Sequence, residues 1–156
     1  MSSQAHRAVE SDLVAAVRSR FAELPNASRF NDQECEMIYG QGCNFFRQNA
    51  YEKAADVFSL LALYRPLEAR YVTAHAMCQK LLRRFDIAVQ LFATVMILEP
   101  GNPKPVMHAA ECFFAMGQEE TAISVLKSVL VIAGEGSEHA EMRERAEGWL
   151  ALAERT

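Results

Sequence analysis

The stretch YEKAADVFSLLALYRP, residues 51–66, returns twice along the chain in altered form. It returns as FDIAVQLFATVMILEP at residues 85–100 and as EETAISVLKSVLVIAG at residues 119–134, a step of 34 residues each time. Five columns of similar or equivalent residues keep this step: Ala54, Ala88 and Ala122; Phe58, Phe92 and Leu126; Leu61, Val95 and Val129; Pro66, Pro100 and Gly134; Gly42, Ala76 and Ala110. Agreement of five columns in one register indicates an internal repeat.

A period of 34 residues with small, aromatic and proline positions in this order is typical of the tetratricopeptide repeat, a helix-turn-helix unit. The sequence therefore predicts an all-α fold, a right-handed α-solenoid of three tandem repeats at residues 35–68, 69–102 and 103–136. We call the first helix of each repeat helix A and the second helix B. Hydrophobic spacing predicts A helices at 33–48, 68–82 and 104–116, and B helices at 51–64, 85–98 and 119–133.

Two further helices are expected outside the repeats. In the segment 1–34, Val9, Leu13, Val17 and Phe21 recur at helical spacing, which predicts an amphipathic helix over residues 8–24. Pro25 ends it, because proline disfavours helix at the residue before it. Residues 137–156 are predicted to form a capping helix with Ser137 as its N-cap. Its expected apolar side chains are Met142, Ala146, Trp149, Leu150 and Leu152.

Composition argues against several classes of partner. The net charge of -4 and the pI near 5.6 argue against nucleic acid, which needs a basic surface. No basic start followed by an apolar core occurs at the N-terminus, so we expect no signal peptide. The most apolar run, residues 57–64, is far shorter than a membrane span. The four cysteines, Cys35, Cys43, Cys78 and Cys112, form no C-x-x-C pair, and we expect a reducing cytosol.

Two histidine–cysteine pairs raise the question of a metal site. His75 lies three residues before Cys78, and His108 four residues before Cys112, spacings at which zinc can be bound. Packing between helices is the favoured alternative, because buried cysteine behaves as a small apolar residue. His108 and Glu111 lack an accompanying nucleophile or second carboxylate, and no glycine-rich phosphate loop is found. We therefore expect no metal, no cofactor and no enzymatic activity.

The concave face of a tetratricopeptide array usually binds a peptide. Counted from residues 35, 69 and 103, the positions that line it are mainly the second, fifth, ninth and twelfth of each repeat, which also include Glu36 and Lys104. The predicted binding site is Tyr39, Cys43 and Phe46 from the first repeat, Arg70, Thr73, Met77 and Lys80 from the second, and Met107, Glu111 and Phe114 from the third. Aromatic and methionine side chains with few polar groups indicate a groove for an apolar segment. Repeat proteins that grip a terminal carboxylate present Lys, Arg and Asn here, so that type of partner is disfavoured.

Several stretches resemble the class II chaperones of bacterial type III secretion. They are Ala55-Asp56-Val57-Phe58-Ser59-Leu60-Leu61, His108-Ala109-Ala110-Glu111-Cys112 with Gly117 and Ala122, and the tail from Gly134-Glu135-Gly136-Ser137-Glu138-His139 to Arg145-Ala146-Glu147. The resemblance covers roughly residues 30–155. It implies a bacterial cytosolic chaperone that holds an extended segment of a hydrophobic translocator protein in its groove. Tyr39 and Phe46 match aromatic pocket residues of the family, whereas Cys43 replaces a residue that is often aromatic.

The resemblance also implies self-association. The N-terminal helix of such chaperones often serves dimerisation, so we expect a homodimer in the absence of cargo, formed through Val9, Leu13, Val17 and Phe21. Three alternatives remain for function: a chaperone of an effector or of a needle or filament subunit, a general scaffold between folded proteins, and an enzyme. For the leading hypothesis, replacing Tyr39 and Phe46 together by Ala is expected to abolish cargo binding while leaving thermal unfolding nearly unchanged.

Overall fold

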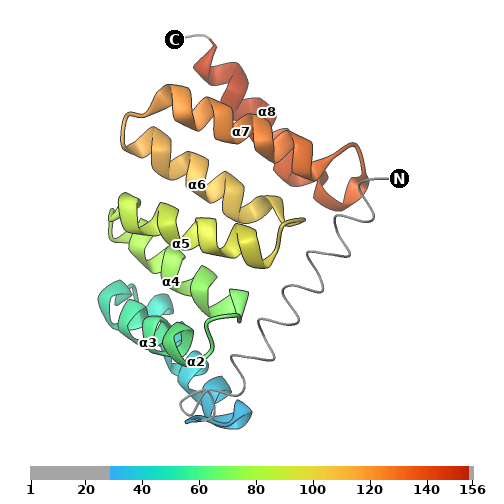
Figure 1. Ribbon diagram of the computed structural model, residues 1–156. Helices are drawn as coiled ribbons and strands as arrows, with labels where there is room; N and C mark the ends of the chain where they lie inside the picture. The colour runs from blue at the N-terminus through green and yellow to red at the C-terminus, as the bar shows by residue number, and fades with distance from the viewer. Residues whose placement is uncertain (1–28, 155–156) are drawn as a thin grey trace.

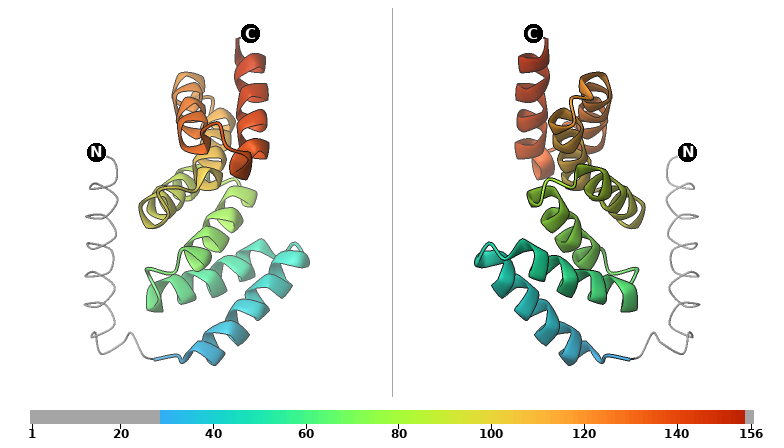
Figure 2. Two further views of the ribbon diagram at one scale, coloured as in Figure 1. Left: turned by 90° about the vertical axis from the view of Figure 1, so that its right-hand side faces the viewer. Right: turned by 90° about the vertical axis from the view of Figure 1, so that its left-hand side faces the viewer.

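The computed structural model describes residues 29–154, in which every regular element is helical (Figure 1). The elements are α2 (Asp32–Arg47), α3 (Tyr51–Tyr64), α4 (Ala69–Leu81), α5 (Phe85–Leu98), α6 (Pro103–Ala115), α7 (Glu119–Ala133), a short 3-10 helix η1 (Ser137–His139) and α8 (Ala140–Ala153). Consecutive helices pack against one another in chain order, which makes an elongated all-α solenoid (Figures 1 and 2). The predicted fold class is confirmed.

The helix boundaries follow the local sequence closely. The three B helices, α3, α5 and α7, begin and end at the predicted residues. The A helices α2 and α6 begin one residue earlier than predicted. Asn31 caps α2 by accepting a hydrogen bond from the Glu34 backbone, while the Glu34 carboxylate accepts one from the Asn31 backbone. Asn102 accepts from the Lys104 backbone in the same way, and Pro103 fits the first turn because it has no N–H to satisfy.

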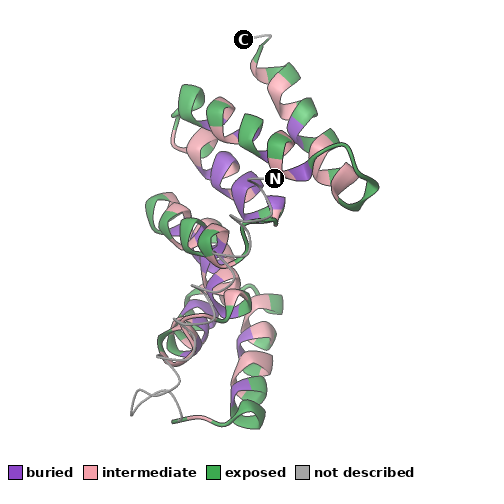
Figure 3. Ribbon diagram, turned by 45° about the vertical axis from the view of Figure 1, so that its right-hand side comes forward, coloured by how far each residue is buried: buried purple, intermediate pink, exposed green. Residues whose placement is uncertain are grey.

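The columns that repeat in the sequence form the core. Ala54, Ala88 and Ala122 have no exposed surface, and neither have Ala76 and Ala110. At Gly42, which shares the column of Ala76 and Ala110, an added Cβ would lie 2.5 Å from the Phe58 ring. Small residues are therefore required here because the A and B helices of a repeat approach closely. Figure 3 shows α6, which lies between α5 and α7, as the most continuously buried helix.

The turns between the helices of a repeat share one backbone conformation. Asn49, Arg83 and Gly117 have φ values of 58°, 61° and 73°, and they occupy the same position of successive repeats. This left-handed conformation reverses the chain after each A helix. Glycine adopts it freely and asparagine tolerates it, whereas arginine pays a steric cost. The repeat thus conserves the geometry of its turn with three different residues.

The C-terminal segment corrects two predictions. Ser137 is the first residue of η1 and not an N-cap; α8 starts at Ala140 without a side-chain cap. The Arg143 guanidinium instead holds this loop, donating to the carbonyl oxygens of Gly134 at 2.7 Å and Gly136 at 3.2 Å. Leu152, expected to face inward, is 64% exposed. Within residues 29–154, no helix combines the length and apolar character needed to cross a membrane.

Candidate peptide-binding face

We use "inner face" for the ten A-helix residues predicted to line the groove: Tyr39, Cys43, Phe46, Arg70, Thr73, Met77, Lys80, Met107, Glu111 and Phe114. They lie on α2, α4 and α6. Nine of them keep some exposed surface, and Met107 is fully buried. The expectation that Met107 presents surface in the groove is therefore wrong. Its side chain belongs to a core cluster that includes Ala146 of α8.

An aromatic and cationic group joins α2 to α4. The Arg70 guanidinium lies 4.7 Å from the ring centre of Tyr39 and 4.8 Å from that of Tyr71, so it stacks with both rings. Arg70 also forms an ion pair with Glu36, and this hydrogen bond raises the pKa of the guanidinium. Burial raises the pKa of Tyr39, and the neighbouring Cys43 adds to the shift. At neutral pH the Tyr39 side chain is therefore an uncharged phenol that packs against the permanently charged Arg70 guanidinium.

Tyr39 and Phe46 are less free than the sequence suggested. The Tyr39 ring lies 5.4 Å from that of Phe58 and 5.6 Å from that of Tyr71, while Phe46 meets Tyr51 edge-on at 5.4 Å. Both side chains pack against the core cluster of the first repeat, as Cys43 also does. Replacing Tyr39 and Phe46 by Ala would remove these contacts. The melting temperature is therefore expected to fall and not to stay unchanged.

The central repeat offers the least engaged part of the inner face. Thr73 and Met77 are half-buried side chains on α4, one helical turn apart. Met77 packs against the cluster formed by Ala76, Ala88 and Phe92 while keeping part of its surface open. A flexible thioether at this place can adapt to side chains of different shape.

Glu111 of α6 is the centre of a charged network that joins α6 to α4 and to α8. Its carboxylate pairs with Lys80 of α4 and with Arg145 of α8, and it lies 3.1 Å from His108 Nδ1. Lys80 Nζ is also 3.2 Å from the same imidazole nitrogen. The Glu111 side chain is only 9% exposed, so the carboxylate is largely removed from water. Two predicted ligand-binding residues, Lys80 and Glu111, thus bind each other.

The network keeps Glu111 ionised. Burial alone would raise its pKa, but hydrogen bonds from His108 and Lys80, together with their charges, lower the pKa to about 2. The carboxylate is therefore charged at neutral pH and is paired with the cations of Lys80 and Arg145. A charged group of a ligand would gain little binding free energy here, because the charges of Glu111, Lys80 and Arg145 are already paired with one another.

Helix α8, which the sequence predicts only as a cap, contacts α6 through two side chains. The ring centres of Phe114 and Trp149 lie 5.1 Å apart, and Arg145 reaches Glu111. Arg145 and Trp149 therefore continue the inner face beyond the third repeat. The signal was present in the sequence, since Arg145 follows Glu111 by the same step of 34 residues.

The histidine–cysteine pairs are part of the packing. Cys78 and Cys112 have no exposed surface, and burial raises the pKa of each thiol to about 11. His75 Nε2 lies 2.9 Å from Gln79 Nε2, and burial lowers the pKa of His75. Within residues 29–154 no group of three or more His, Cys, Asp and Glu side chains is placed to hold a metal ion. The predicted dimerisation residues Val9, Leu13, Val17 and Phe21 lie outside the described residues.

Known proteins share this architecture. The family model described as Tetratricopeptide repeat matches residues 107–131. The Low calcium response locus protein H of Yersinia pestis is 24% identical over 115 residues, which are 74% of this chain and 68% of that protein. PcrH, a Pseudomonas aeruginosa protein solved in complex with the chaperone binding region of PopD, aligns with a TM-score of 0.76 at 23% identity, over 81% of this chain and 96% of PcrH.

The type III secretion chaperone SycD of Yersinia enterocolitica gives a similar match. Its complex with a peptide of the translocator YopD aligns with a TM-score of 0.75 at 21% identity, over 81% of this chain and 97% of SycD. Another SycD structure is an alternative dimer. The chain is therefore similar to Low calcium response locus protein H over about three quarters of its length, and it has the tetratricopeptide fold that PcrH and SycD share.

Proposed function

We propose that this chain is a chaperone of bacterial type III secretion that binds an extended segment of a hydrophobic translocator on its inner face. The relatives support this proposal, because PcrH and SycD were solved with segments of PopD and YopD. The chaperone keeps the translocator soluble and competent for export. It acts by binding alone, in the bacterial cytoplasm, and is a homodimer when free of cargo.

One observation carries the proposal: the three charged side chains of the inner face, Arg70, Lys80 and Glu111, all have ion-pair partners. Glu36 pairs with Arg70, and Glu111 pairs with Lys80 and Arg145. Apolar side chains with open surface lie between these pairs: Tyr39, Phe46, Met77 and Phe114. The face therefore favours apolar side chains of a ligand, each worth roughly 1.5–3 kcal/mol when fully buried.

An extended segment suits this arrangement better than a folded surface. The inner-face residues come from successive A helices, so they form a row along the array and not a single deep cavity. A segment that becomes ordered only on binding can place a side chain at each repeat while the rest of the cargo stays unfolded. This allows a pore-forming protein to be held without being folded.

The proposal is tested by co-expressing the chain with a translocator and measuring the soluble, co-purified cargo. Met77→Glu places a charge at the centre of the inner face, and Thr73→Arg fills the space one turn away. Met37→Glu is the matched control, because Met37 lies on α2, outside the inner face, and is 75% exposed. We expect wild type and the control to keep the translocator soluble and both inner-face variants to lose it.

The variants must first be shown to be folded, by circular dichroism and a melting curve. Folded Met77→Glu and Thr73→Arg proteins that still solubilise the translocator would contradict the assignment of the inner face. A wild-type chain that solubilises a needle subunit or an effector but no translocator would instead contradict the cargo class.

A further inference from the structure

Helix α8 continues the register of the A helices. Ala146 follows Cys112 and Cys78 by successive steps of 34 residues, and all three side chains have no exposed surface. Helix α8 packs against α7 as α6 packs against α5 (Figure 1). The positions of α8 that correspond to the inner face are therefore 141, 145 and 148.

Glycine occupies the last of these positions. Gly148 corresponds to Phe46, Lys80 and Phe114 in the three repeats. A Cβ at Gly148 would meet nothing within 4 Å, so α8 leaves open space where each A helix carries a large side chain. The helix itself gains nothing from this glycine, because glycine weakens a helix relative to alanine.

Large apolar side chains accompany this open position. The Trp149 ring lies 5.1 Å from that of Phe114, and both side chains are half-buried. Leu152 lies one turn after Gly148 and is 64% exposed. We call Phe114, Gly148, Trp149 and Leu152 the terminal patch. Because Phe114 also belongs to the inner face, the terminal patch is continuous with that face.

The charge next to the terminal patch is already paired. Arg145 lies one turn before Trp149 on α8, and its guanidinium forms an ion pair with the Glu111 carboxylate of α6. An anionic group of a ligand would therefore have to compete with Glu111 for this cation. The terminal patch favours an apolar side chain instead.

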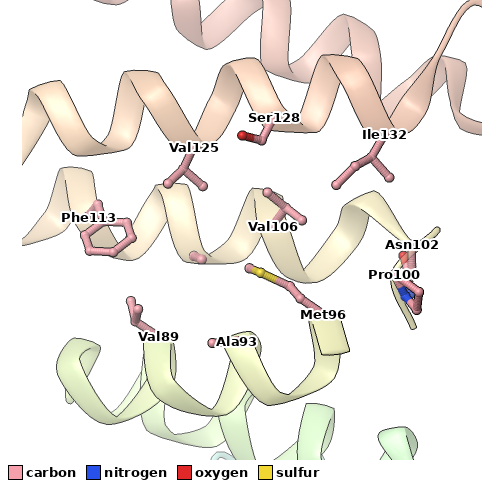
Figure 4. A pocket seen from close by; sticks show the side chains of 11 residues that line it. Val89, Ala93, Met96, Pro100, Asn102, Val106, Phe113, Val125, Ser128 and Ile132 are labelled. Atoms are coloured by element: carbon pink, nitrogen blue, oxygen red, sulfur yellow. The ribbon is translucent and has the colours of Figure 1, made fainter. Parts of the chain in front are cut away.

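An apolar cavity of about 440 Å³ lies on another side of α6 (Figure 4). Helix α6 contributes Val106, Ala109 and Phe113 to its walls, and α7 contributes residues that include Ser128. The inner-face residues of α6 are 107, 111 and 114, which share a different side of the helix. A segment bound on the inner face therefore does not enter this cavity, which provides a control site.

We propose that the terminal patch binds an apolar side chain of the same cargo segment that occupies the inner face. The recognised segment then continues past the third repeat onto α8. This inference rests on the proposed function, because it requires cargo on the inner face. About two to three residues of extended chain, at about 3.3 Å each, cover the 8–10 Å between packed helices such as α6 and α8.

Photocrosslinking in the co-expressed complex tests the contact. The photoreactive residue p-benzoylphenylalanine replaces Leu152 in the terminal patch, Phe46 on the inner face, or Val131, an 82% exposed residue of α7 outside both. We expect adducts with the translocator from positions 46 and 152 and none from position 131. An adduct from position 46 alone, or equal adducts from 131 and 152, would overturn this inference and leave the proposed function standing. Adducts from none of the three positions would overturn both.

Calorimetric titration of the translocator's chaperone-binding region gives the second readout. Gly148→Leu fills the open position with a good helix former, and Leu152→Glu places a charge in the terminal patch. Each is expected to bind roughly five-fold more weakly than wild type, because an apolar contact is lost. Ser128→Leu at the cavity and Val131→Glu on α7 are the matched controls and should bind as wild type does. Unchanged or tighter binding by either terminal-patch variant would overturn the inference.

Discussion

Arg145 on α8 and Glu111 on α6 form an ion pair across the same 34-residue step that relates the repeats. Helix α8 therefore takes the place of a fourth A helix, although no B helix follows it within the described residues. The contact of Trp149 with Phe114 supports the same placement. The cap thus closes the end of the solenoid and extends the inner face at the same time.

The network around Glu111 predicts a pH-dependent contribution to stability. Its pKa is lowered from 4.5 to about 2, so the folded state favours the ionised carboxylate. The contribution is complete above about pH 4.5 and is lost as the pH falls towards about 2. We expect Glu111→Gln to reduce the free energy of unfolding by roughly 2 kcal/mol at pH 7 and by much less near pH 2.

Urea unfolding of wild type and Glu111→Gln across this pH range measures the difference directly. Glu147→Gln, which changes an exposed carboxylate on α8, serves as the control and should follow wild type at each pH. A loss in Glu111→Gln that stays constant from pH 7 to pH 2 would show that the ionised network is not its source.

Two glycines of α2 predict opposite effects of the same substitution. A Cβ at Gly42 would lie 2.5 Å from the Phe58 ring, whereas a Cβ at Gly40 would meet nothing within 4 Å. We expect Gly42→Ala to destabilise the protein by about 1–3 kcal/mol through overpacking. Gly40→Ala should stabilise it by about 0.5–1 kcal/mol, because alanine favours helix over glycine. Chemical denaturation of both variants checks the prediction, and a stabilised Gly42→Ala protein would refute the role of small residues in this column.

The turn glycine Gly117 has a different requirement from a helical glycine. Its φ of 73° is unfavourable for a residue with a Cβ, so Gly117→Ala should cost about 1–2 kcal/mol. Gly148 lies inside α8 with open space around it, and Gly148→Ala should gain about 0.5–1 kcal/mol. Thermal melting of the pair distinguishes the two cases, and a shift of the same sign in both would contradict the prediction.

Most of the fold could be predicted from the sequence because repeated residues report repeated packing. The ends of α3 and α5 follow from Pro66 and Pro100, and that of α7 from Gly134, whose φ of 60° suits glycine. The start of α8 was missed because Arg143 holds the preceding loop by reaching back to two carbonyl oxygens. Such a contact has no local sequence signal.

The inner face was harder to predict than the fold. Counting along the repeat placed Met107 on this face, but the residue is buried in the cluster that also contains Ala146 of α8. The count also placed Lys80 and Glu111 in the groove, yet it could not show that they pair with each other. Side-chain partners depend on the spacing between helices, which a count within one helix does not contain.

The central claim, that apolar side chains of a translocator bind on the inner face, is tested most directly by calorimetric titration. The ligand is a synthetic peptide from the chaperone-binding region of the cognate translocator, titrated into wild type, Met77→Glu and Met37→Glu. We predict equal affinity for wild type and Met37→Glu, and an affinity at least about ten-fold lower for Met77→Glu, a loss of about 1.4 kcal/mol. A folded Met77→Glu protein that binds the peptide as tightly as wild type would contradict the claim.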